Sequence, residues 1–313
     1  MIVLFVFLAI LIIYVIFVLG PAVTMYAKVF TKKDGSFSDK RDIKKTYFAP
    51  YEGTIRSGYD FFEGMSKERI EVRAFDEAPL SADYYDNGSD RMMIFMHGYN
   101  GSPLSNFAAI ARYFYERGVN VLLVYERAHG VSGGKASSLG ILEANDVITF
   151  TKWAEEKKGI TDVFLYGISM GSSSIMYASD RLNDFSKVKG MILDCGFSSP
   201  YGQLRKDCVM RHLPYGMLLP IISLLAKALL KIDIHDTVGE HLKKTSVPAF
   251  FVHGCLDETV SITDSERNFE LTASEKDFYR VENGHHACAW FEGEEKVKKA
   301  IMDFVEKFKA KED

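Results

Sequence analysis

The residues with the clearest chemical potential form the pentapeptide Gly-Ile-Ser-Met-Gly at positions 167–171. A run of β-forming residues, 163–166, precedes it, and residues suited to a helix follow it. Glycines at both ends permit a sharp strand-to-helix turn, because side chains there would collide with neighbouring backbone. Such a turn lifts the hydroxyl of Ser169 above a sheet, beside the helix N-terminus. The motif is short and recurs by chance, so the rest of the chain must supply a base, an acid and oxyanion donors.

An acid and a base follow two later apolar strands. Asp257 lies in the loop His-Gly-Cys-Leu-Asp that begins directly after residues 250–252. Two adjacent histidines, His285 and His286, lie in the loop after the strand expected over residues 278–281. The order serine, acid, histidine differs from the orders of the chymotrypsin and subtilisin types. We therefore expect Asp257 to orient one of the two histidines, which acts as the base for Ser169.

Two backbone N–H groups from different segments are expected to bind the oxyanion: one lies in the loop after an earlier strand, and the other belongs to the residue that follows Ser169. The apolar strand 92–96 ends in His-Gly-Tyr-Asn-Gly, residues 97–101. The backbone N–H groups of Tyr99 and Met170 are positioned to stabilise a developing negative oxygen, at ~3 kcal/mol for each donor. His97 is interpreted as a structural residue, because the base is better placed after the last strand.

Strands and helices alternate along the rest of the chain, which predicts a mostly parallel sheet covered by helices on both faces. The expected strands are 69–75, 80–85, 92–96, 119–125, 162–166, 191–194, 249–253 and 278–281, and the expected helices are 51–65, 106–116, 142–157, 172–181, 262–271 and 294–308. Residues 201–242, rich in Leu, Met and Ile, interrupt the alternation. They form either an ordinary core helix pair or a helical cap that lines an acyl-binding pocket, and we favour the cap.

The N-terminal segment, residues 1–27, has no charged side chain and is long enough to cross a bilayer as one helix. A cleaved signal peptide is the alternative, but no Lys or Arg precedes the apolar run. We expect a single-pass transmembrane anchor in the cell membrane, followed by a juxtamembrane linker over residues 28–50. Lysines and arginines outnumber acidic residues in this linker, so the catalytic domain, residues 51–313, is expected on the cytoplasmic side.

Composition excludes some partners. The formal net charge is −4 and no basic stripe is present, so nucleic acid is not an expected partner. The four cysteines lack C-x-x-C spacing and a nearby cluster of metal-ligand type, so we expect free thiols and no metal site. The proposed chemistry requires no cofactor.

The chain from about residue 70 to residue 308 resembles the α/β-hydrolase superfamily, most closely bacterial serine hydrolases of the serine aminopeptidase-like or acyl-transferase-like type. The matching segments are residues 97–102, 127–134, 167–171, 253–257 and 286–287. The resemblance implies an α/β-hydrolase fold and a triad of Ser169, Asp257 and His286, with His285 as the alternative base. It implies that Asp194, at the end of another strand, is a second possible position for the acid, although Asp257 fits its motif better.

The sequence therefore predicts a serine hydrolase that cleaves carboxylic ester or related acyl bonds in a small-molecule or lipid-like substrate. The same triad also serves aminopeptidases, amidases and thioesterases, and acyl transfer to an acceptor other than water. A non-catalytic binding protein with this fold is the alternative from a different class. The loop 127–134 is interpreted as a structural turn, in which Arg127 and His129 brace neighbouring loops.

Overall fold

The computed structural model describes residues 2–31, 43 and 48–309 of the chain. Within this part, eight strands form one sheet in the order β1-β2-β4-β3-β5-β6-β7-β8. The strands are β1 (Glu68–Arg73), β2 (Pro79–Tyr85), β3 (Arg91–Met96), β4 (Asn120–Tyr125), β5 (Asp162–Ile168), β6 (Val188–Asp194), β7 (Ala249–Gly254) and β8 (Lys276–Val281). Every strand expected from the sequence is present.

The sheet is mostly parallel, as the alternation of strands and helices predicts. Strand β2 pairs antiparallel with β1 and β4, whereas every other neighbouring pair is parallel. The central strands β3, β4, β5 and β7 are buried along almost their whole length, which explains their near-continuous apolar sequences. The carboxyl ends of the parallel strands lie at one edge of the sheet. The predicted catalytic residues lie in the loops that begin at this edge.

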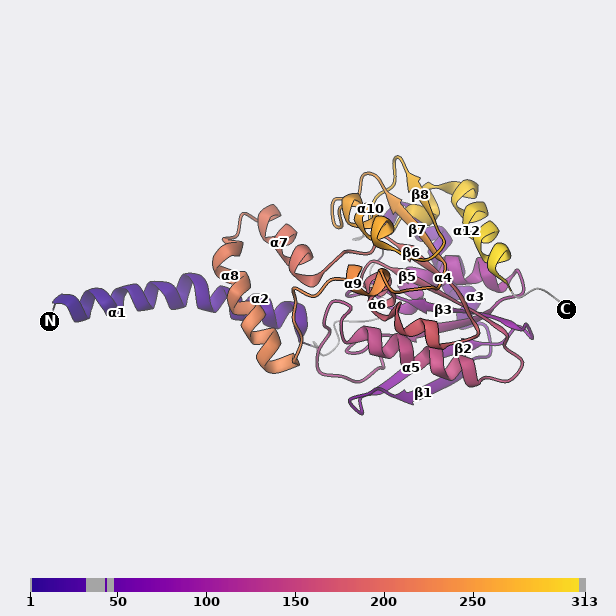
Figure 1. Ribbon diagram of the computed structural model, residues 1–313, viewed down its shortest axis with the longest axis horizontal. Helices are drawn as coiled ribbons and strands as arrows, with labels where there is room; N and C mark the ends of the chain where they lie inside the picture. Colours follow the sequence, from indigo (N-terminus) through magenta and orange to yellow (C-terminus); the bar gives the residue numbers. More distant parts are fainter. Residues whose placement is uncertain (1, 32–42, 44–47, 310–313) are drawn as a thin grey trace.

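Helices cover both faces of the sheet (Figure 1). Side chains of α5 (Glu143–Glu156), α6 (Met170–Ala178) and α9 (Gly239–Leu242) share a core with one face. Side chains of α3 (Glu52–Glu63), α4 (Pro103–Tyr115), α11 (Ala289–Glu292) and α12 (Glu294–Phe308) share a core with the other. The helix α10 (Ile262–Leu271) follows β7. Two hydrophobic cores thus fix the sheet from opposite sides.

The block 201–242 is helical, as expected. It contains α7 (Pro200–Met210), α8 (Tyr215–Leu225), a π-helical turn (Ala226–Leu230) and α9. Leu204 of α7 and Leu218 and Ile222 of α8 belong to a third apolar cluster, which also contains Met170 beside the predicted nucleophile. Helices α7 and α8 therefore pack over the carboxyl edge of the sheet, whereas α9 at the end of the block contributes to one of the two main cores.

The N-terminal segment differs from the expected single helix. It is divided into α1 (Ile2–Tyr14), a π-helical turn (Val15–Leu19) and α2 (Gly20–Phe30). Pro21 has no backbone N–H to donate, and the Gly20 N–H bonds to the carbonyl of Val15 in a wider, π-type turn. Helix α1 stands away from the body with its apolar side chains exposed (Figure 1).

Among the described residues, no helix is both long and apolar enough to span a bilayer. The predicted transmembrane helix over residues 1–27 is therefore not supported, because the segment is interrupted at the π-helical turn. The predicted boundary between residues 27 and 28 also falls inside α2. Most of the predicted basic linker, residues 32–42 and 44–47, lies outside the described residues.

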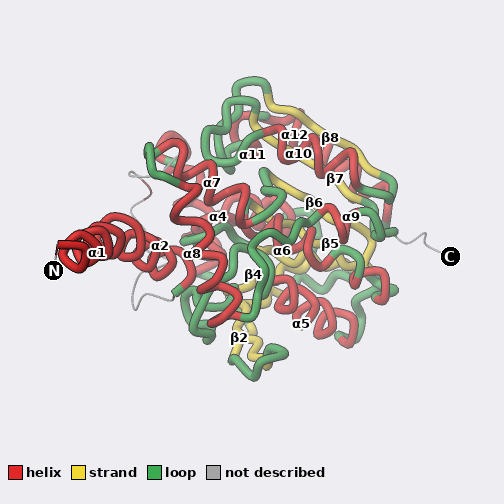
Figure 2. The backbone as a smooth tube through the Cα atoms, turned by 60° about the vertical axis from the view of Figure 1, so that its left-hand side comes forward, coloured by secondary structure: helices red, strands yellow, loops and turns green. Residues whose placement is uncertain are grey.

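Helix α2 packs against the cap. Ala22, Tyr26 and Phe30, spaced four residues apart, are at most 6% exposed and belong to the same apolar cluster as α7 and α8. The tube view shows α2 beside α8 (Figure 2). The second half of the N-terminal segment is thus an integral part of the cap layer.

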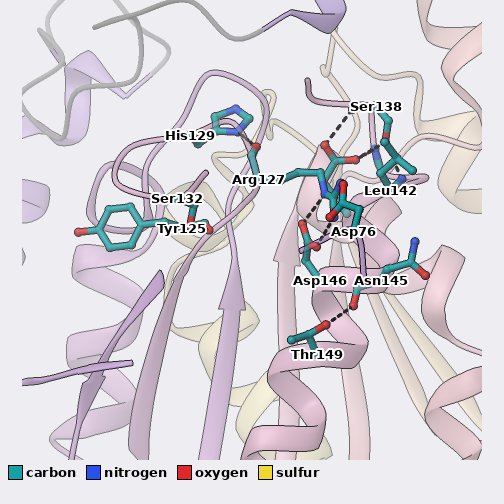
Figure 3. A network of polar contacts seen from close by, with 12 residues as sticks. Asp76, Tyr125, Arg127, His129, Ser132, Ser138, Leu142, Asn145, Asp146 and Thr149 are labelled. Atoms are coloured by element: carbon teal, nitrogen blue, oxygen red, sulfur yellow. Dashed lines mark hydrogen bonds and ion pairs between the residues drawn. The ribbon is translucent and has the colours of Figure 1, made fainter. Parts of the chain in front are cut away.

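A buried ion pair holds the long loop that follows β4 (Figure 3). Nε and Nη2 of Arg127 donate to the two carboxylate oxygens of Asp146 on α5, at 2.7 and 2.6 Å, and Nη1 lies 3.1 Å from Asp76. The side chain of Arg127 is 2% exposed and that of Asp146 is 0% exposed. The predicted bracing role of Arg127 is confirmed.

Removing the cation is expected to destabilise the fold. In Arg127→Met, Asp146 is left buried without its partner, and we expect the free energy of unfolding to fall by about 3–5 kcal/mol. Chemical denaturation monitored by tryptophan fluorescence measures the change. Lys299→Met is the matched control, because its ion pair with Asp303 is largely exposed and should contribute little. An Arg127→Met variant as stable as the control would contradict this account.

Candidate active site

Ser169 lies at the turn between β5 and α6 in a strained backbone conformation. Its φ and ψ angles are +53° and −114°, in a region that side chains rarely adopt. Its N–H donates to the carbonyl of Asp194 at 2.8 Å, and its carbonyl accepts from the N–H of Ser173 at 3.0 Å. The backbone of Ser169 is therefore held from β6 and from the first turn of α6.

The two motif glycines are required by close packing. A Cβ atom on Gly167 would lie 2.5 Å from the backbone of Gly171 and Ser172, and one on Gly171 would overlap the carbonyl of Met96. Helix α6 therefore approaches β5 and the end of β3 too closely for any side chain at either position. The glycines predicted to permit the strained turn do so.

His286 is hydrogen-bonded to Asp257, as expected. Its Nδ1 lies 2.7 Å from the Oδ2 of Asp257, whose carboxylate is fully buried. The other oxygen of Asp257 accepts from the N–H groups of Thr259 and Val260, each at 2.8 Å. The loop after β7 therefore closes on its own aspartate and aims the remaining oxygen at the loop after β8.

A second histidine on Asp257 was not anticipated. The Nε2 of His253, the fifth residue of β7, lies 3.2 Å from Oδ2 of Asp257, and its Nδ1 lies 2.7 Å from the hydroxyl of Ser265. Burial by itself raises the pKa of Asp257, but hydrogen bonds from His253 and His286 outweigh it and hold that pKa well below its usual range. The histidine four residues before the aspartate was the available sequence signal.

The structure separates the two adjacent histidines. The side chain of His285 is 54% exposed, and its Nδ1 lies 2.9 Å from Glu292 on α11. His286 instead turns into the fold, where its side chain is 11% exposed. Only one of the two candidate bases, His286, is therefore in contact with Asp257.

The loop after β3 lies beside the serine. A Cβ atom on Gly98 would lie 3.5 Å from the Cβ of Ser169. The N–H of Gly98 donates to the side chain of Asn106 at 2.8 Å, and that of Asn100 donates to His129 at 3.2 Å. These bonds fix the backbone on both sides of Tyr99, one of the two predicted oxyanion donors.

The other predicted oxyanion donor, Met170, is the first residue of α6, where backbone N–H groups and the helix dipole favour negative charge.

His97 has the structural role expected for it. It is fully buried, its Nδ1 contacts the carbonyl of Gly98 at 2.9 Å, and its Nε2 accepts from the N–H of Glu126 at 3.2 Å. Burial, together with the nearby His129, lowers the pKa of His97 to about 3. It is therefore neutral across the usual assay range and ties the β3 loop to the β4 loop.

A cavity of about 440 Å³ lies next to the serine turn, the loop after β3 and the loop that carries His286. Ser169, His286 and Tyr99 line it together with the apolar side chains of Leu139, Phe197 and Leu204. The cavity is also lined by Asp207, which lies in α7, and by Arg211, which caps the carboxyl end of that helix. The cap helix α7 and the sheet edge thus enclose a mainly apolar space with a few polar groups, as small-molecule sites do.

Asp194, the alternative acid, has a different environment. Its side chain is fully buried, and neither carboxylate oxygen accepts a well-formed hydrogen bond among the described residues. Burial raises the pKa of Asp194 to about 8, with a further contribution from the charge of Asp257. Asp194 is therefore largely a neutral acid near pH 7, whereas Asp257 is ionised.

Cys195 completes a cluster of possible metal ligands. Its Sγ and ligand atoms of Asp257 and His286 all lie within 4.8 Å of one another. Asp257 already accepts hydrogen bonds at both oxygens, and burial raises the pKa of the Cys195 thiol well above its usual value. The donor set is thus satisfied by hydrogen bonds and lacks a thiolate. Among the described residues, Cys195, Cys208 and Cys255 form no disulfide.

Comparison with known proteins shows similarity to a protein family and to a bacterial relative. Residues 88–231 match the family described as serine aminopeptidase, S33. The chain is 27% identical over 263 residues to the uncharacterized protein YqkD of Bacillus subtilis, covering 80% of this chain and 84% of YqkD.

Solved structures share the fold. The esterase Pf2001 of Pyrococcus furiosus superposes with a TM-score of 0.65 at 21% identity, over 78% of this chain and 92% of the esterase. Est1E of Butyrivibrio proteoclasticus, solved with ferulic acid bound, gives 0.57 at 18% identity, over 76% and 98% of the two chains. The chain thus has the fold of these α/β-hydrolase structures, and its residues 88–231 are similar to a family of serine hydrolases.

The neutral state of Asp194 predicts a pH dependence of stability. Since its folded-state pKa lies above its unfolded value, the folded protein binds a proton that the unfolded chain releases, and stability falls as pH rises from about 4 to about 8. Asp194→Asn cannot ionise. The free energy of unfolding of Asp194→Asn, minus that of the wild type, should therefore increase by about 1 kcal/mol for each pH unit in this window.

Urea denaturation of both proteins at pH 5, 6, 7 and 8 measures this difference. Parallel stability curves for the two proteins would mean that Asp194 is ionised in the folded state, which contradicts the assignment.

Proposed function

We propose that the protein is a serine hydrolase that cleaves carboxylic ester or related acyl bonds. The observation that carries the proposal is the 2.7 Å contact between His286 and the buried, ionised Asp257, made at the cavity that Ser169 also lines. A strained serine at a helix N-terminus, a histidine oriented by a buried carboxylate and an adjacent glycine-rich loop together suit acyl transfer.

In the proposed reaction, Nδ1–H of His286 stays bonded to Asp257, which leaves Nε2 as the base. Nε2 takes the proton of Ser169 as its Oγ attacks the acyl carbon. The C=O electron pair moves onto oxygen, next to the N–H groups of Tyr99 and Met170. His286 then gives the proton to the leaving alkoxide as the C–O bond breaks, and a water molecule releases the acyl group by the same steps.

The apolar lining of the cavity supports an acyl ester as substrate, including a lipid-like one. Leu139, Phe197 and Leu204 offer an apolar wall next to Ser169, suited to an acyl chain. That the related Est1E was solved with ferulic acid, a carboxylic acid, agrees with this class of product.

Aminoacyl amide cleavage is the second candidate. The family description, serine aminopeptidase, favours it, and so does the carboxyl group of Asp207 in the cavity, which has the charge needed to bind a free amino group. Burial raises the pKa of Asp207, and the charges of Arg211 and Lys206 oppose this effect. We rank ester cleavage first because the cavity wall next to Ser169 is mainly apolar.

The roles of the triad residues are tested with an active-site probe. The full-length protein should react covalently with a fluorophosphonate, and Ser169→Ala should abolish labelling. His286→Ala should lower kcat by at least about 10³-fold, as expected when a nucleophile loses its base. His285→Ala is the matched control, because its exposed side chain bonds to Glu292, and it should retain activity within about threefold. Equal losses in the two histidine variants would contradict the assignment of His286.

The substrate class is tested with p-nitrophenyl esters of increasing acyl length and aminoacyl p-nitroanilides, using Ser169→Ala as the blank. We expect kcat/KM to rise with acyl length until the chain fills the cavity, by up to about threefold to fourfold for each buried CH₂. Turnover of the anilides with uniformly poor ester cleavage would instead identify an aminopeptidase.

A further inference from the structure

The carboxyl-terminal turn of α2 touches the side chain of Tyr99. The hydroxyl of Tyr99 donates to the carbonyls of Lys28 and Val29, each at 3.0 Å. These carbonyls belong to the last turn of the helix, where acceptors lack partners within the helix itself. A single hydroxyl therefore caps α2 and attaches it to the loop whose backbone is proposed to bind the oxyanion.

The same turn is connected to Met170, the second proposed donor residue. The N–H of Ser137 donates to the carbonyl of Phe30 at 3.0 Å, and the hydroxyl of Ser137 contacts Sδ of Met170 at 3.4 Å. Thr31 and Ala136 form an antiparallel bridge next to this contact. The end of α2 thus contacts one donor residue directly and the other through Ser137.

Helix α2 is itself fixed in place. Its buried residues Ala22, Tyr26 and Phe30 pack in one apolar cluster with α8, and Val29 lines the cavity that contains Ser169. A rigid helix can impose a position on a loop, whereas a mobile arm cannot. The packing on α8 supplies that rigidity.

We propose that the last turn of α2, residues 28–31, sets the geometry of the oxyanion hole, and that Tyr99 is its positioning residue. The inference rests on the proposed function, because it assigns a role to α2 in the same reaction. The Tyr99 ring lies in the cavity wall, while its hydroxyl holds the backbone N–H at the distance that the tetrahedral oxygen requires. The last turn of α2 is then part of the proposed active site.

The test removes the hydroxyl and keeps the ring. In full-length Tyr99→Phe we expect kcat on the best p-nitrophenyl ester to fall about tenfold with KM changed less than about twofold, because the lost alignment acts only on the transition state. The affinity for a trifluoromethyl ketone, whose serine adduct carries an oxyanion, should weaken by the same factor. A tyrosine that merely fills space would leave both quantities at their wild-type values.

The matched control is Tyr115→Phe. The hydroxyl of Tyr115 also donates to a backbone carbonyl, that of Asp86, at 3.0 Å, but on an exposed surface away from the cavity lining. This variant should keep wild-type kcat and inhibitor affinity. Ser137→Ala tests the other connection if Tyr99→Phe does not fold, and a twofold to fivefold loss in kcat at constant KM is expected.

The rate of fluorophosphonate labelling separates the two possible failures, since it requires a reactive serine but no known substrate. Absence of labelling in the wild type means that the proposed function fails. Labelling of the wild type and of Tyr99→Phe at the same rate means that the function stands and the positioning role of α2 is overturned. Labelling that is about tenfold slower in Tyr99→Phe, with a wild-type rate in Tyr115→Phe, supports the proposal.

Discussion

The close approach of α6 to strands β3 and β5 is the constraint on which the active-site region depends. Gly167 and Gly171 allow the backbone of α6 to contact the strand that precedes it and the carbonyl of Met96, and the turn between them forces Ser169 to a positive φ. Because β3, β5 and β6 are parallel neighbours, their carboxyl ends deliver three loops to the same edge of the sheet. The glycine-rich loop, the serine and the carbonyl of Asp194 meet there as a direct result of strand order.

Two buried carboxyl groups near this edge illustrate how environment assigns chemical roles. Asp257 accepts hydrogen bonds from two backbone N–H groups and contacts His253 and His286, so its negative charge is stabilised despite burial. Within the described part of the chain, Asp194 has no comparable donors, and its raised pKa of about 8 keeps it protonated below that pH. The fold thus places one fixed negative charge behind His286 and keeps the second carboxyl group neutral, which avoids repulsion between the two.

The packing of the cap layer shows that α2, unlike α1, is an integral part of the folded body. Helices α2, α7 and α8 share one apolar cluster with Met170, and the cavity lies between that cluster and the sheet edge. The proposed acyl-binding pocket and the proposed oxyanion donor Met170 therefore border the same packed layer. The loop after β4, anchored by Arg127 on Asp146, is also part of this arrangement, since it carries Leu139 to the cavity and Ser137 to α2.

The amino-acid sequence alone was sufficient to predict the strands, most helices, the serine turn, the helical nature of residues 201–242 and the loops that carry Asp257 and the paired histidines. These features depend on local patterns: apolar periodicity, glycines at a strained turn, and residues that directly follow strands. Three features became evident in the folded structure: the contact of His286, rather than His285, with Asp257, the contact of His253 with Asp257, and the π-helical turn that interrupts the apolar N-terminal segment. Adjacent histidines have the same neighbours in the sequence, so local patterns do not distinguish them. An apolar helix has the same sequence pattern whether it packs against lipid or against another helix. Contacts between residues distant in sequence, such as those of His286 with Asp257 and of Phe30 with the cap, are not contained in these local patterns.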